Sequence, residues 1–502
     1  MDRGGDLVHF LGIDAGTTGV TVGVYDENGN LIAKSYSEFE TYYPQPGWVE
    51  QNADHWWNSI IDACRQAVKI AKASDSIAAI AVANQRETIV PVGKDGEPVS
   101  RAIVWQDRRC IEEVELIKRR IGEERIAEIT GLKPDPYFSL PKILWWMRHT
   151  DVVERSWKLM LVHDYIVYKL TGEIVTDYSN ASRTMLLDIK SRKWWDEIFE
   201  EFNLDVSLLP DLVNSGEVVG EIRGNVAERL GINSKAVVVA GGGDQQCSAL
   251  AQGVVREGKV KSTTGTGTFM VAPVEKIKDY GEIIYSAHVV PNINVGEVSI
   301  FTTGSLLSWV KREFYKGEDY DVINEEAERS GIGARGVFIL PFFSGAGCPH
   351  WNPLARGAIL GLTLAHNRGD IARAVMESVA FEVRTNIEVM ERKGIKIEEL
   401  RLDGGAAKSM LWNQIFADVT GKRCLVSSDV EATARGAAIL AASGSDNFSG
   451  IDDALKVFLP DFTEVLPQED GKKVYEEIYS RYFRLREVNL NSGGIEWEYC
   501  LS

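Results

Sequence analysis

The sequence predicts an α/β fold with more than one domain, and three observations lead to this prediction. The chain has 502 residues, well beyond the size at which a single hydrophobic core stops growing. Apolar runs of strand length alternate with stretches of helical spacing, which is typical of α/β domains. A strand followed by a glycine-rich turn occurs near the start and again in the middle of the chain. The organisation of the first domain therefore recurs in the second.

The first elements are expected to form a β-hairpin, a helix and a buried strand. Residues 8–26 are apolar on both sides of the turn Ala15–Gly19 and lead into the polar turn Glu27–Asn30. This pattern is typical of a β-hairpin. Residues 52–73 have apolar side chains at helical spacing, and residues 77–83 read as a buried strand.

The second half begins with the same pattern of an apolar strand followed by a glycine-rich turn. AVVVAGGGDQ at residues 236–245 is a strand with a glycine-rich turn, and KVKSTTGTGTFMVAP begins at Lys259. We place the domain boundary near residue 250, giving domains 1–250 and 251–502. Residues 400–407 read as a strand and glycine turn, and residues 409–420 as a helix. A C-terminal amphipathic helix is expected over residues 471–486, with Val474, Ile478, Tyr482 and Leu485 on its apolar stripe.

Composition narrows the classes of partner and location. Lys plus Arg total 55 against 73 Asp plus Glu, a formal charge of -18, which disfavours nonspecific binding to nucleic acid or to an anionic membrane. The six cysteines are scattered without a CxxC pair, so neither a disulfide framework nor a zinc site is indicated. The start MDRGGDLVHFLGIDAG is interrupted by charges, unlike a signal peptide, and no run reaches the length of a membrane span. A cytoplasmic protein is expected.

Two glycine- and threonine-rich turns suggest phosphate binding. The turn after Asp14 carries Thr17 and Thr18, so backbone N–H groups and hydroxyls can reach phosphate oxygens while Asp14 holds Mg²⁺ or its waters. Residues 263–268, TTGTGT, repeat the design in the second half. Each turn alone is explained equally well as a polar hairpin, but one in each domain could clamp a polyphosphate. The weaker pattern DGGAA at residues 403–407 offers glycines for close backbone approach to a nucleotide.

In their order along the chain, the motifs DxGTT, NQRET, AIVWQDRR, DPYFS, GDQQ, TGTG and LDGGAA resemble those of the FGGY carbohydrate kinases. The resemblance runs from Leu11 to about Ala442. It implies two actin-like ATPase domains, also called ribonuclease H-like, with a deep interdomain cleft. It also implies that ATP and Mg²⁺ bind mainly to the second domain and a small polyol or sugar mainly to the first. Homo-oligomers are frequent in the family, so a homo-oligomer is one arrangement to consider.

The first half looks like the glycerol kinases, and the resemblance assigns roles to matching positions. Asp244 of GDQQ is expected to be the catalytic base. The residues expected to contact the substrate are Arg86, Glu87, Trp105, Tyr137, Asp244, Gln245 and Phe269. Those expected to bind the nucleotide are Thr17, Thr18, Gly265, Thr266, Gly267, Gly304, Ser308, Gly405 and Ser409, and Asp14 is the expected metal ligand. Arginine and carboxylate suit polyol hydroxyls, and aromatic rings suit C–H faces.

The predicted activity is ATP-dependent phosphorylation of a terminal hydroxyl of a small polyol, with glycerol, giving glycerol 3-phosphate, as the leading candidate. Singly, each residue has an ordinary explanation as core, surface ion pair or helix cap. The second half, from Gly404 to Asp418 and from Glu431 to Ala442, is closer to pentulose kinases. A ketose kinase for xylulose or ribulose, or a kinase of a longer polyol, is therefore the alternative. A non-catalytic actin-like scaffold is a remote one. Thr21 replaces a basic residue typical of glycerol kinases, which leaves nucleotide preference open.

Overall fold

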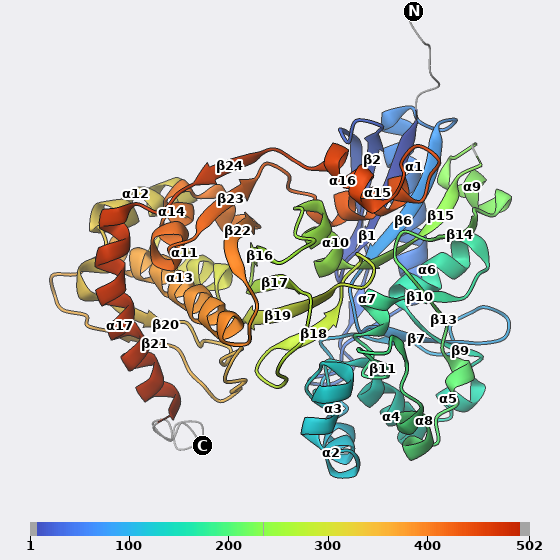
Figure 1. Cartoon of the computed structure of the whole chain (residues 1–502), viewed down its shortest axis with the longest axis horizontal. Helices are drawn as coiled ribbons and strands as arrows, with labels where there is room; N and C mark the ends of the chain where they lie inside the picture. The colour runs from blue at the N-terminus through green and yellow to red at the C-terminus, as the bar shows by residue number, and fades with distance from the viewer. Residues whose placement is uncertain (1–7, 234, 492–502) are drawn as a thin grey trace, which may run out of the picture. The chain divides into compact units, whose positions relative to one another are not determined.

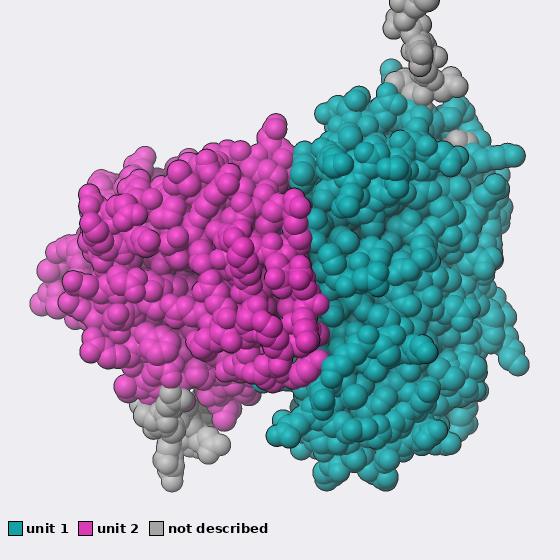
Figure 2. Space-filling view, in the orientation of Figure 1, with its two compact units in different colours: residues 1–255, 284–295, 431–459 teal, residues 256–283, 296–430, 460–502 magenta. Residues whose placement is uncertain are grey.

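The computed structural model describes residues 8–233 and 235–491. The charged start of the chain and Cys500 lie outside these residues. The chain divides into two compact units, coloured separately in Figure 2. Unit 1 comprises residues 1–255, 284–295 and 431–459, and unit 2 comprises residues 256–283, 296–430 and 460–502. Both units are α/β, as predicted, and the interdomain cleft stays a prediction.

Unit 1 is built on a sheet with the strand order β14-β15-β6-β1-β2-β3; Figure 1 labels all of these strands except β3. These strands are β1 (His9–Ala15), β2 (Gly19–Asp26), β3 (Leu31–Glu38), β6 (Ile77–Asn84), β14 (Val218–Glu221) and β15 (Val237–Gly243). The predicted hairpin is confirmed as β1 and β2, which pair antiparallel with Asp14 opposite Thr21. Strand β6 runs parallel to β1 and places Ala83 opposite Asp14.

The remaining strands of unit 1 are short. They are β4 (Thr41–Tyr42), β5 (Glu50–Gln51), β7 (Ile89–Val92), β8 (Ala102–Ile103), β9 (Lys158–Leu161), β10 (Val175–Asp177), β11 (Leu187–Asp188), β12 (Lys193–Trp194), β13 (Asp211–Val213) and β18 (Ile284–Ala287). The helices are α1 (Ala53–Ala71), α2 (Ile111–Arg120), α3 (Glu123–Thr130), α4 (Ser139–His149), α5 (Val152–Arg155), α6 (Val162–Thr171), α7 (Tyr178–Ala181), α8 (Asp196–Phe202), α9 (Gly224–Leu230), α10 (Asp244–Ala251), α15 (Ala432–Ser443) and α16 (Ile451–Phe458).

Helix α1 confirms the predicted helix, and its ends are set by local chemistry. The Asn52 side chain accepts a hydrogen bond from the Asp54 N–H, which satisfies one of the free donors at the start of the helix. Lys72 adopts a left-handed conformation that ends it. The apolar face carries fully buried Trp56, Ile60 and Cys64, so the helix covers the sheet with its amphipathic side.

Helix α15 joins unit 1 although it lies near the C-terminus of the chain. A Cβ at Gly12 of β1 would lie 2.0 Å from the Ala434 carbonyl oxygen, and one at Gly436 would lie 2.0 Å from that of Cys247. Glycines at these contacts therefore let α15 approach β1 and α10 at backbone distance. The division near residue 250 stays a prediction of where the domains meet along the chain; the compact units differ from it in residues 284–295 and 431–459.

The central strands of unit 2 pair in the same directions as those of unit 1. Its main strands lie in the order β19-β17-β16-β22-β23-β24, with β16 antiparallel to β17 and parallel to β22, as β1 is to β2 and β6. The strands are β16 (Gly258–Thr264), β17 (Thr268–Val274), β19 (Asn294–Ile300), β20 (Phe338–Leu340), β21 (Ala358–Leu360), β22 (Ile397–Asp403), β23 (Arg423–Ser427) and β24 (Phe462–Val465). The helices are α11 (Gly304–Phe314), α12 (Tyr320–Ser330), α13 (Arg368–Arg392), α14 (Met410–Thr420) and α17 (Glu469–Asn491).

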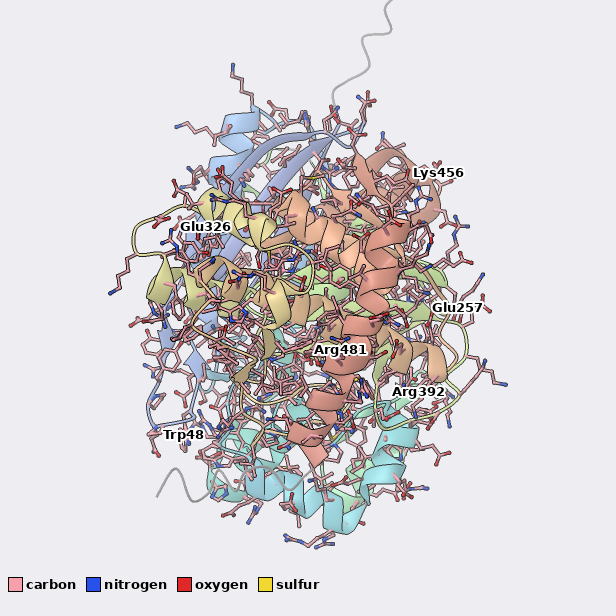
Figure 3. All side chains as sticks on the ribbon, turned by 90° about the vertical axis from the view of Figure 1, so that its left-hand side faces the viewer. Trp48, Glu257, Glu326, Arg392, Lys456 and Arg481 are labelled. Carbon is pink, nitrogen blue, oxygen red and sulfur yellow. The ribbon has the colours of Figure 1, made fainter. Side chains whose placement is uncertain are left out.

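The C-terminal helix α17 is confirmed, but the apolar stripe predicted for it is wrong at Val474 and Leu485 and confirmed at Tyr482. Val474 is 47% and Leu485 36% exposed, whereas Tyr475 and Tyr482 are fully buried. The hydroxyls of these tyrosines donate hydrogen bonds to Glu377 and Glu382 of the buried helix α13. Tyr475 was not among the predicted core residues, whereas Tyr482 was, and both phenols satisfy buried carboxylates. Figure 3 shows α17 with the exposed side chain of Arg481.

Candidate active site

Three glycines at the end of β15 bring the predicted base close to Arg86. A Cβ at Gly241 would lie 1.9 Å from the Val82 carbonyl oxygen, and one at Gly243 would lie 2.6 Å from Cδ of Arg86. Without these side chains β15 can lie tightly against β6, and Asp244 then begins α10. Its Oδ1 lies 3.3 Å from Nε of Arg86, which is almost fully buried, while the Asp244 side chain is 30% exposed. A carboxylate that solvent can reach is thus held by a buried cation.

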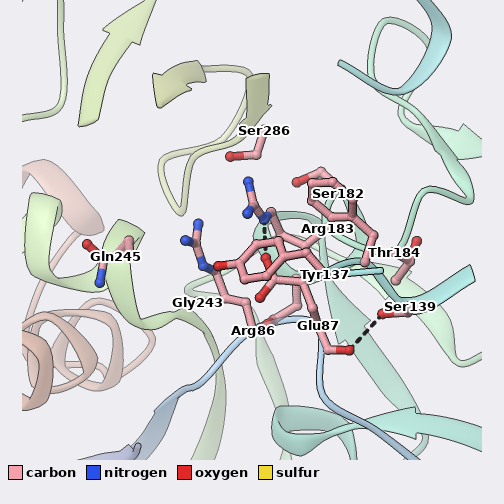
Figure 4. Close-up of polar contacts among 12 residues, drawn as sticks. Arg86, Glu87, Tyr137, Ser139, Ser182, Arg183, Thr184, Gly243, Gln245 and Ser286 are labelled. Carbon is pink, nitrogen blue, oxygen red and sulfur yellow. Dashed lines mark hydrogen bonds and ion pairs between the residues drawn. The ribbon is translucent and has the colours of Figure 1, made fainter. Parts of the chain in front are cut away.

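Glu87 forms a buried ion pair with a residue that the motifs did not single out. Nε of Arg183 donates to Oε1 of Glu87, and both side chains are at most 2% exposed; Figure 4 shows this contact. Burial raises the pKa of the Glu87 carboxyl, while the Arg183 and Arg86 charges act to lower it. Arg183 lies in the segment TDYSNASRTML at residues 176–186, where an arginine among small and apolar residues was the available signal.

The backbone at Glu87 is held by α4. Glu87 has a positive φ of 63°, a conformation that costs a non-glycine residue free energy. Its carbonyl oxygen accepts hydrogen bonds from Ser139 Oγ at 3.1 Å and from Lys142 Nζ at 3.4 Å. Lys142 also donates to the carbonyl oxygens of Tyr137 and Phe138. Burial lowers the pKa of Lys142 to about 8. This lysine was not predicted from the sequence. It links the backbone of Glu87 to the segment before α4 that carries Tyr137.

Trp105 and Tyr137 make an aromatic edge beside these charges. Their ring centroids are 5.5 Å apart and the planes are 83° to one another. The Arg183 guanidinium carbon lies 5.4 Å from the Tyr137 ring centroid. Nε1 of Trp105 donates to the Thr17 hydroxyl at 3.1 Å. The structure therefore joins one residue expected at the nucleotide, Thr17, directly to one expected at the substrate.

The glutamines after Asp244 behave differently from one another. The Gln245 N–H donates to Oδ1 of Asp244 at 2.7 Å, and its side chain is half-buried on α10. Gln246 was given no role from sequence, yet its Oε1 accepts from Arg86 at 3.2 Å and its Nε2 donates to Ser286 of β18 at 3.0 Å. The buried amide thus orients the arginine that faces Asp244.

One carboxylate oxygen of Asp14 is buried, and the group suits a bound cation. Its Oδ1 is fully buried and has no hydrogen-bond partner among the described residues. Burial raises its pKa to about 8, and the negative charges of Asp244 and Glu431 add to this effect. No group of three or more His, Cys, Asp or Glu is arranged to hold a metal within residues 8–233 and 235–491. The fit is to Mg²⁺, which takes one or two carboxylates together with waters and phosphate oxygens.

Unit 2 contains the second glycine and threonine turn. Gly265 donates its N–H to the Gly267 carbonyl at 2.9 Å, and Thr266 accepts from the Thr303 N–H at 3.1 Å. A Cβ at Gly304, the first residue of α11, would lie 2.1 Å from the Gly265 carbonyl oxygen. A Cβ at Gly265 itself would meet no described atom within 4 Å. The structure thus gathers Gly265, Thr266, Gly267 and Gly304 into a turn with an open side.

The other residues predicted in unit 2 contact different neighbours and form no single cluster among the described residues. Phe269 on β17 is 37% exposed. Ser308 donates to the Gly304 carbonyl at 3.0 Å, which places it one turn into α11. Gly405 is exposed, and Ser409 caps α14 and bonds to Asn324 at 2.9 Å. Gly404, whose φ is 84°, would place a Cβ 2.5 Å from the Thr264 carbonyl oxygen, so β22 and β16 deliver both glycine turns to one edge of the sheet.

Comparison with known proteins defines the class. Residues 9–251 match the N-terminal domain of the FGGY family of carbohydrate kinases, and residues 260–445 match its C-terminal domain. The chain belongs to this family. A glycerol kinase of Thermococcus onnurineus (strain NA1) is 38% identical over 493 residues, covering 95% of this chain and 96% of that protein. A xylulose kinase of Staphylococcus xylosus is 29% identical over 480 residues, covering 95% and 99%.

Solved structures share the fold. The crystal structure of Plasmodium falciparum glycerol kinase with ADP has a TM-score of 0.87 and 26% identity, covering 96% of this chain and 98% of that one. The actin-like two-domain fold that the resemblance implied is confirmed. No helix in the described part of the chain is both long and apolar enough to cross a membrane.

Proposed function

We propose that the protein is an ATP-dependent kinase that phosphorylates a terminal hydroxyl of glycerol. The observation that carries the proposal is the partly exposed Asp244 carboxylate held 3.3 Å from the buried Arg86, next to the buried pair of Glu87 and Arg183. A carboxylate and a guanidinium beside an aromatic edge suit a compact molecule with hydroxyls on one side and C–H groups on the other. A scaffold without transfer chemistry has no need for this arrangement.

In this mechanism Asp244 accepts the proton of the attacking hydroxyl. Its exposure lets a substrate hydroxyl approach, and the Arg86 guanidinium holds the carboxylate in place. Arg86 and Glu87 bind the neighbouring hydroxyls, the first as donor and the second as acceptor. Trp105 and Tyr137 pack on the carbon chain and exclude water. Positioning of this kind supplies a large part of the rate enhancement in phosphoryl transfer.

Kinases of this family use ATP, with Mg²⁺ as the usual metal. We propose that Asp14 helps to hold Mg²⁺, because its buried oxygen lacks a partner among the described residues. Thr17 and Thr18 in unit 1, and Gly265, Thr266 and Gly267 in unit 2, are the proposed phosphate contacts. Gly304, Ser308, Gly405 and Ser409 are the proposed contacts for the rest of the nucleotide. When bound, Mg²⁺-ATP supplies the phosphoryl group and neutralises charge on its oxygens.

Glycerol is favoured over a ketose by the motif NQRET and by the glycerol kinase relatives at 35 to 38% identity. Xylulose phosphorylation is the second candidate, since a xylulose kinase covers 95% of this chain and Gly404–Asp418 resembles pentulose kinases. A cytoplasmic enzyme without nucleic acid or membrane partners is part of the proposal.

The test is an assay of ADP release with Mg²⁺-ATP and a panel of glycerol, erythritol, dihydroxyacetone, xylulose and ribulose. We expect the highest kcat/KM with glycerol. Asp244→Asn should lower kcat about 10²- to 10⁴-fold, the usual contribution of a general base. Asp62→Asn, which changes an exposed aspartate on α1, is the matched control and should leave kcat unchanged.

Each outcome is decisive for one part of the proposal. A higher kcat/KM with xylulose than with glycerol would refute the substrate and keep the kinase. Near-normal turnover by Asp244→Asn would remove the assigned base. No ADP release with any member of the panel, although Mg²⁺-ATP binds, would favour the scaffold.

A further inference from the structure

A polar pocket of about 170 Å³ lies in unit 1, apart from the residues of the candidate active site. Its walls come from α7, from the turn between β11 and β12, from the chain after β13, and from the chain after β18. Figure 1 labels α7, β11, β13 and β18. The lining residues are Tyr178, Arg192, Asn214, Ser215, His288, Val289, Pro291 and Asn292. A water molecule takes about 30 Å³ of liquid, so the pocket has room for a polyatomic ion of a few atoms.

Arg192 is the only charged group of the lining that is always ionised, and its charge is not compensated. Its Nη2 donates to the Ile293 carbonyl at 2.9 Å and to the Asn294 side-chain oxygen, and both acceptors are neutral. Arg192 makes no ion pair with any described residue, and its Nε and Nη1 have no hydrogen-bond partner among them. A half-buried guanidinium that keeps three N–H groups unused favours an anion.

The carboxylates nearest to the lining are already engaged. Asp177 accepts from Ser215 Oγ at 3.3 Å and from the N–H groups of Ser179 and Asn180. Glu217 accepts from the Asn214 side chain at 2.6 Å. These carboxylates therefore hold the hydroxyl and amide of the lining in place. Their negative charge weakens the attraction of an anion and limits its affinity, but neither carboxylate accepts from Nε or Nη1 of Arg192.

The backbone also indicates that the side chain of Arg192 matters. Arg192 has a φ of 57° at the end of the turn between β11 and β12, where its N–H donates to the Asp188 carbonyl. Glycine or asparagine is the usual residue at a left-handed position of this kind, because other residues are strained there. An arginine here gives up backbone stability in order to present a guanidinium to the pocket.

We propose that this pocket is a binding site for a small phosphate-class oxyanion, either inorganic phosphate or the phosphate group of a small metabolite. Arg192 supplies the positive charge, and Asn214 and the Asn292 backbone turn lie beside it as polar walls. His288 lines the pocket with its Nε2 hydrogen-bonded to the Val254 carbonyl at 2.8 Å. The site is independent of Asp244, since none of its lining residues contributes to the candidate active site.

The test is isothermal titration of the whole protein, without nucleotide, against inorganic phosphate and separately against methyl phosphate, at constant ionic strength set with chloride. We expect saturable binding by the wild-type protein and at least a tenfold loss of affinity in Arg192→Gln. Arg120→Gln removes an exposed arginine that pairs with Glu201 and is the matched control, which should bind as the wild type does. Asp244→Asn should also retain binding, because it changes the kinase site alone.

The two ligands separate the sources of the phosphate group. Binding of methyl phosphate at least as tight as that of phosphate identifies a metabolite ester, and binding of phosphate alone identifies the free ion. Equal affinity in Arg192→Gln and the wild type, or no saturable binding of either ligand, would overturn the proposal. If Arg192→Gln does not fold, Arg192→Lys takes its place: it keeps a charge without the planar donor set, so unchanged affinity in that variant for both ligands would equally refute a site built on the guanidinium.

Discussion

Replacing Arg183 by methionine is the most informative single perturbation of the candidate active site. Methionine has a similar length but no charge, and the change leaves Glu87 buried without its ion-pair partner. The Glu87 side chain is 1% exposed and that of Arg183 2%. Breaking a buried ion pair on one side typically costs about 3 to 5 kcal/mol. Since Arg86 and Lys142 also act on Glu87, we expect the lower end of this range in the free energy of unfolding.

The same change should weaken catalysis through the protonation of Glu87. Arg183 is the strongest of the charges that lower the pKa of this carboxyl against the effect of burial, so its removal raises that pKa. Ionised Glu87 is needed as an acceptor, and it is lost as pH falls through its pKa. The acid limb of kcat/KM for glycerol should therefore move to higher pH. Loss of a charge-assisted hydrogen bond, about 1.5 to 3 kcal/mol, corresponds to about a 10- to 150-fold fall in kcat/KM.

The measurements are urea unfolding without ligands and initial rates at a series of glycerol concentrations and pH values. Arg108→Met removes an exposed ion pair with Asp135 in the same unit and should change stability by less than about 0.5 kcal/mol. Arg183→Lys keeps the charge but loses the planar fork of donors, and should fall between the wild type and Arg183→Met. An acid limb that stays in place, or a stability loss no larger than that of Arg108→Met, would refute this account of Glu87.

Three further predictions concern other parts of the molecule. Gly304→Ala should lower ATP affinity by at least tenfold and leave glycerol binding to the free enzyme unchanged, because its Cβ would lie 2.1 Å from the Gly265 carbonyl oxygen; equal ATP affinity in a nucleotide titration would contradict the role of this turn. Burial lowers the pKa of Lys142 to about 8 from 10.5, so the unfolded chain binds more protons between these values and wild-type stability gains a rising component with pH there. Lys142→Met should flatten this rise of the free energy of unfolding with pH. An unchanged slope would contradict the lowered pKa of Lys142. Removing Mg²⁺ with EDTA should abolish ADP release and restoring it should return full activity, whereas activity that persists in EDTA would exclude Asp14 as a required metal ligand.

Local sequence was enough to predict much of the fold. The hairpin of β1 and β2, the amphipathic helix α1 and the recurrence of a strand with a glycine turn follow from patterns over a few residues, because turn chemistry and apolar spacing act at short range. The buried face of α17 followed only in part from such a pattern, because Tyr482 is buried as predicted while Val474 and Leu485 are exposed. Its buried stripe contains Tyr475 and Tyr482, since carboxylates on a distant helix supply the partners that make burial of a phenol favourable.

The sequence by itself determined the family, because ordered motifs record chemistry that depends on few positions, and the base and substrate contacts that it predicts stay predictions. Only the tertiary structure decided which side chains support them. Arg183 follows Glu87 by 96 residues in the chain yet forms its ion pair, and Gln246 orients Arg86 across 160 residues. The uncompensated Arg192 is likewise defined by its contacts, since its guanidinium forms no ion pair with any described residue. Burial and charge compensation are properties of the assembled chain, since they depend on every group that packs around a residue.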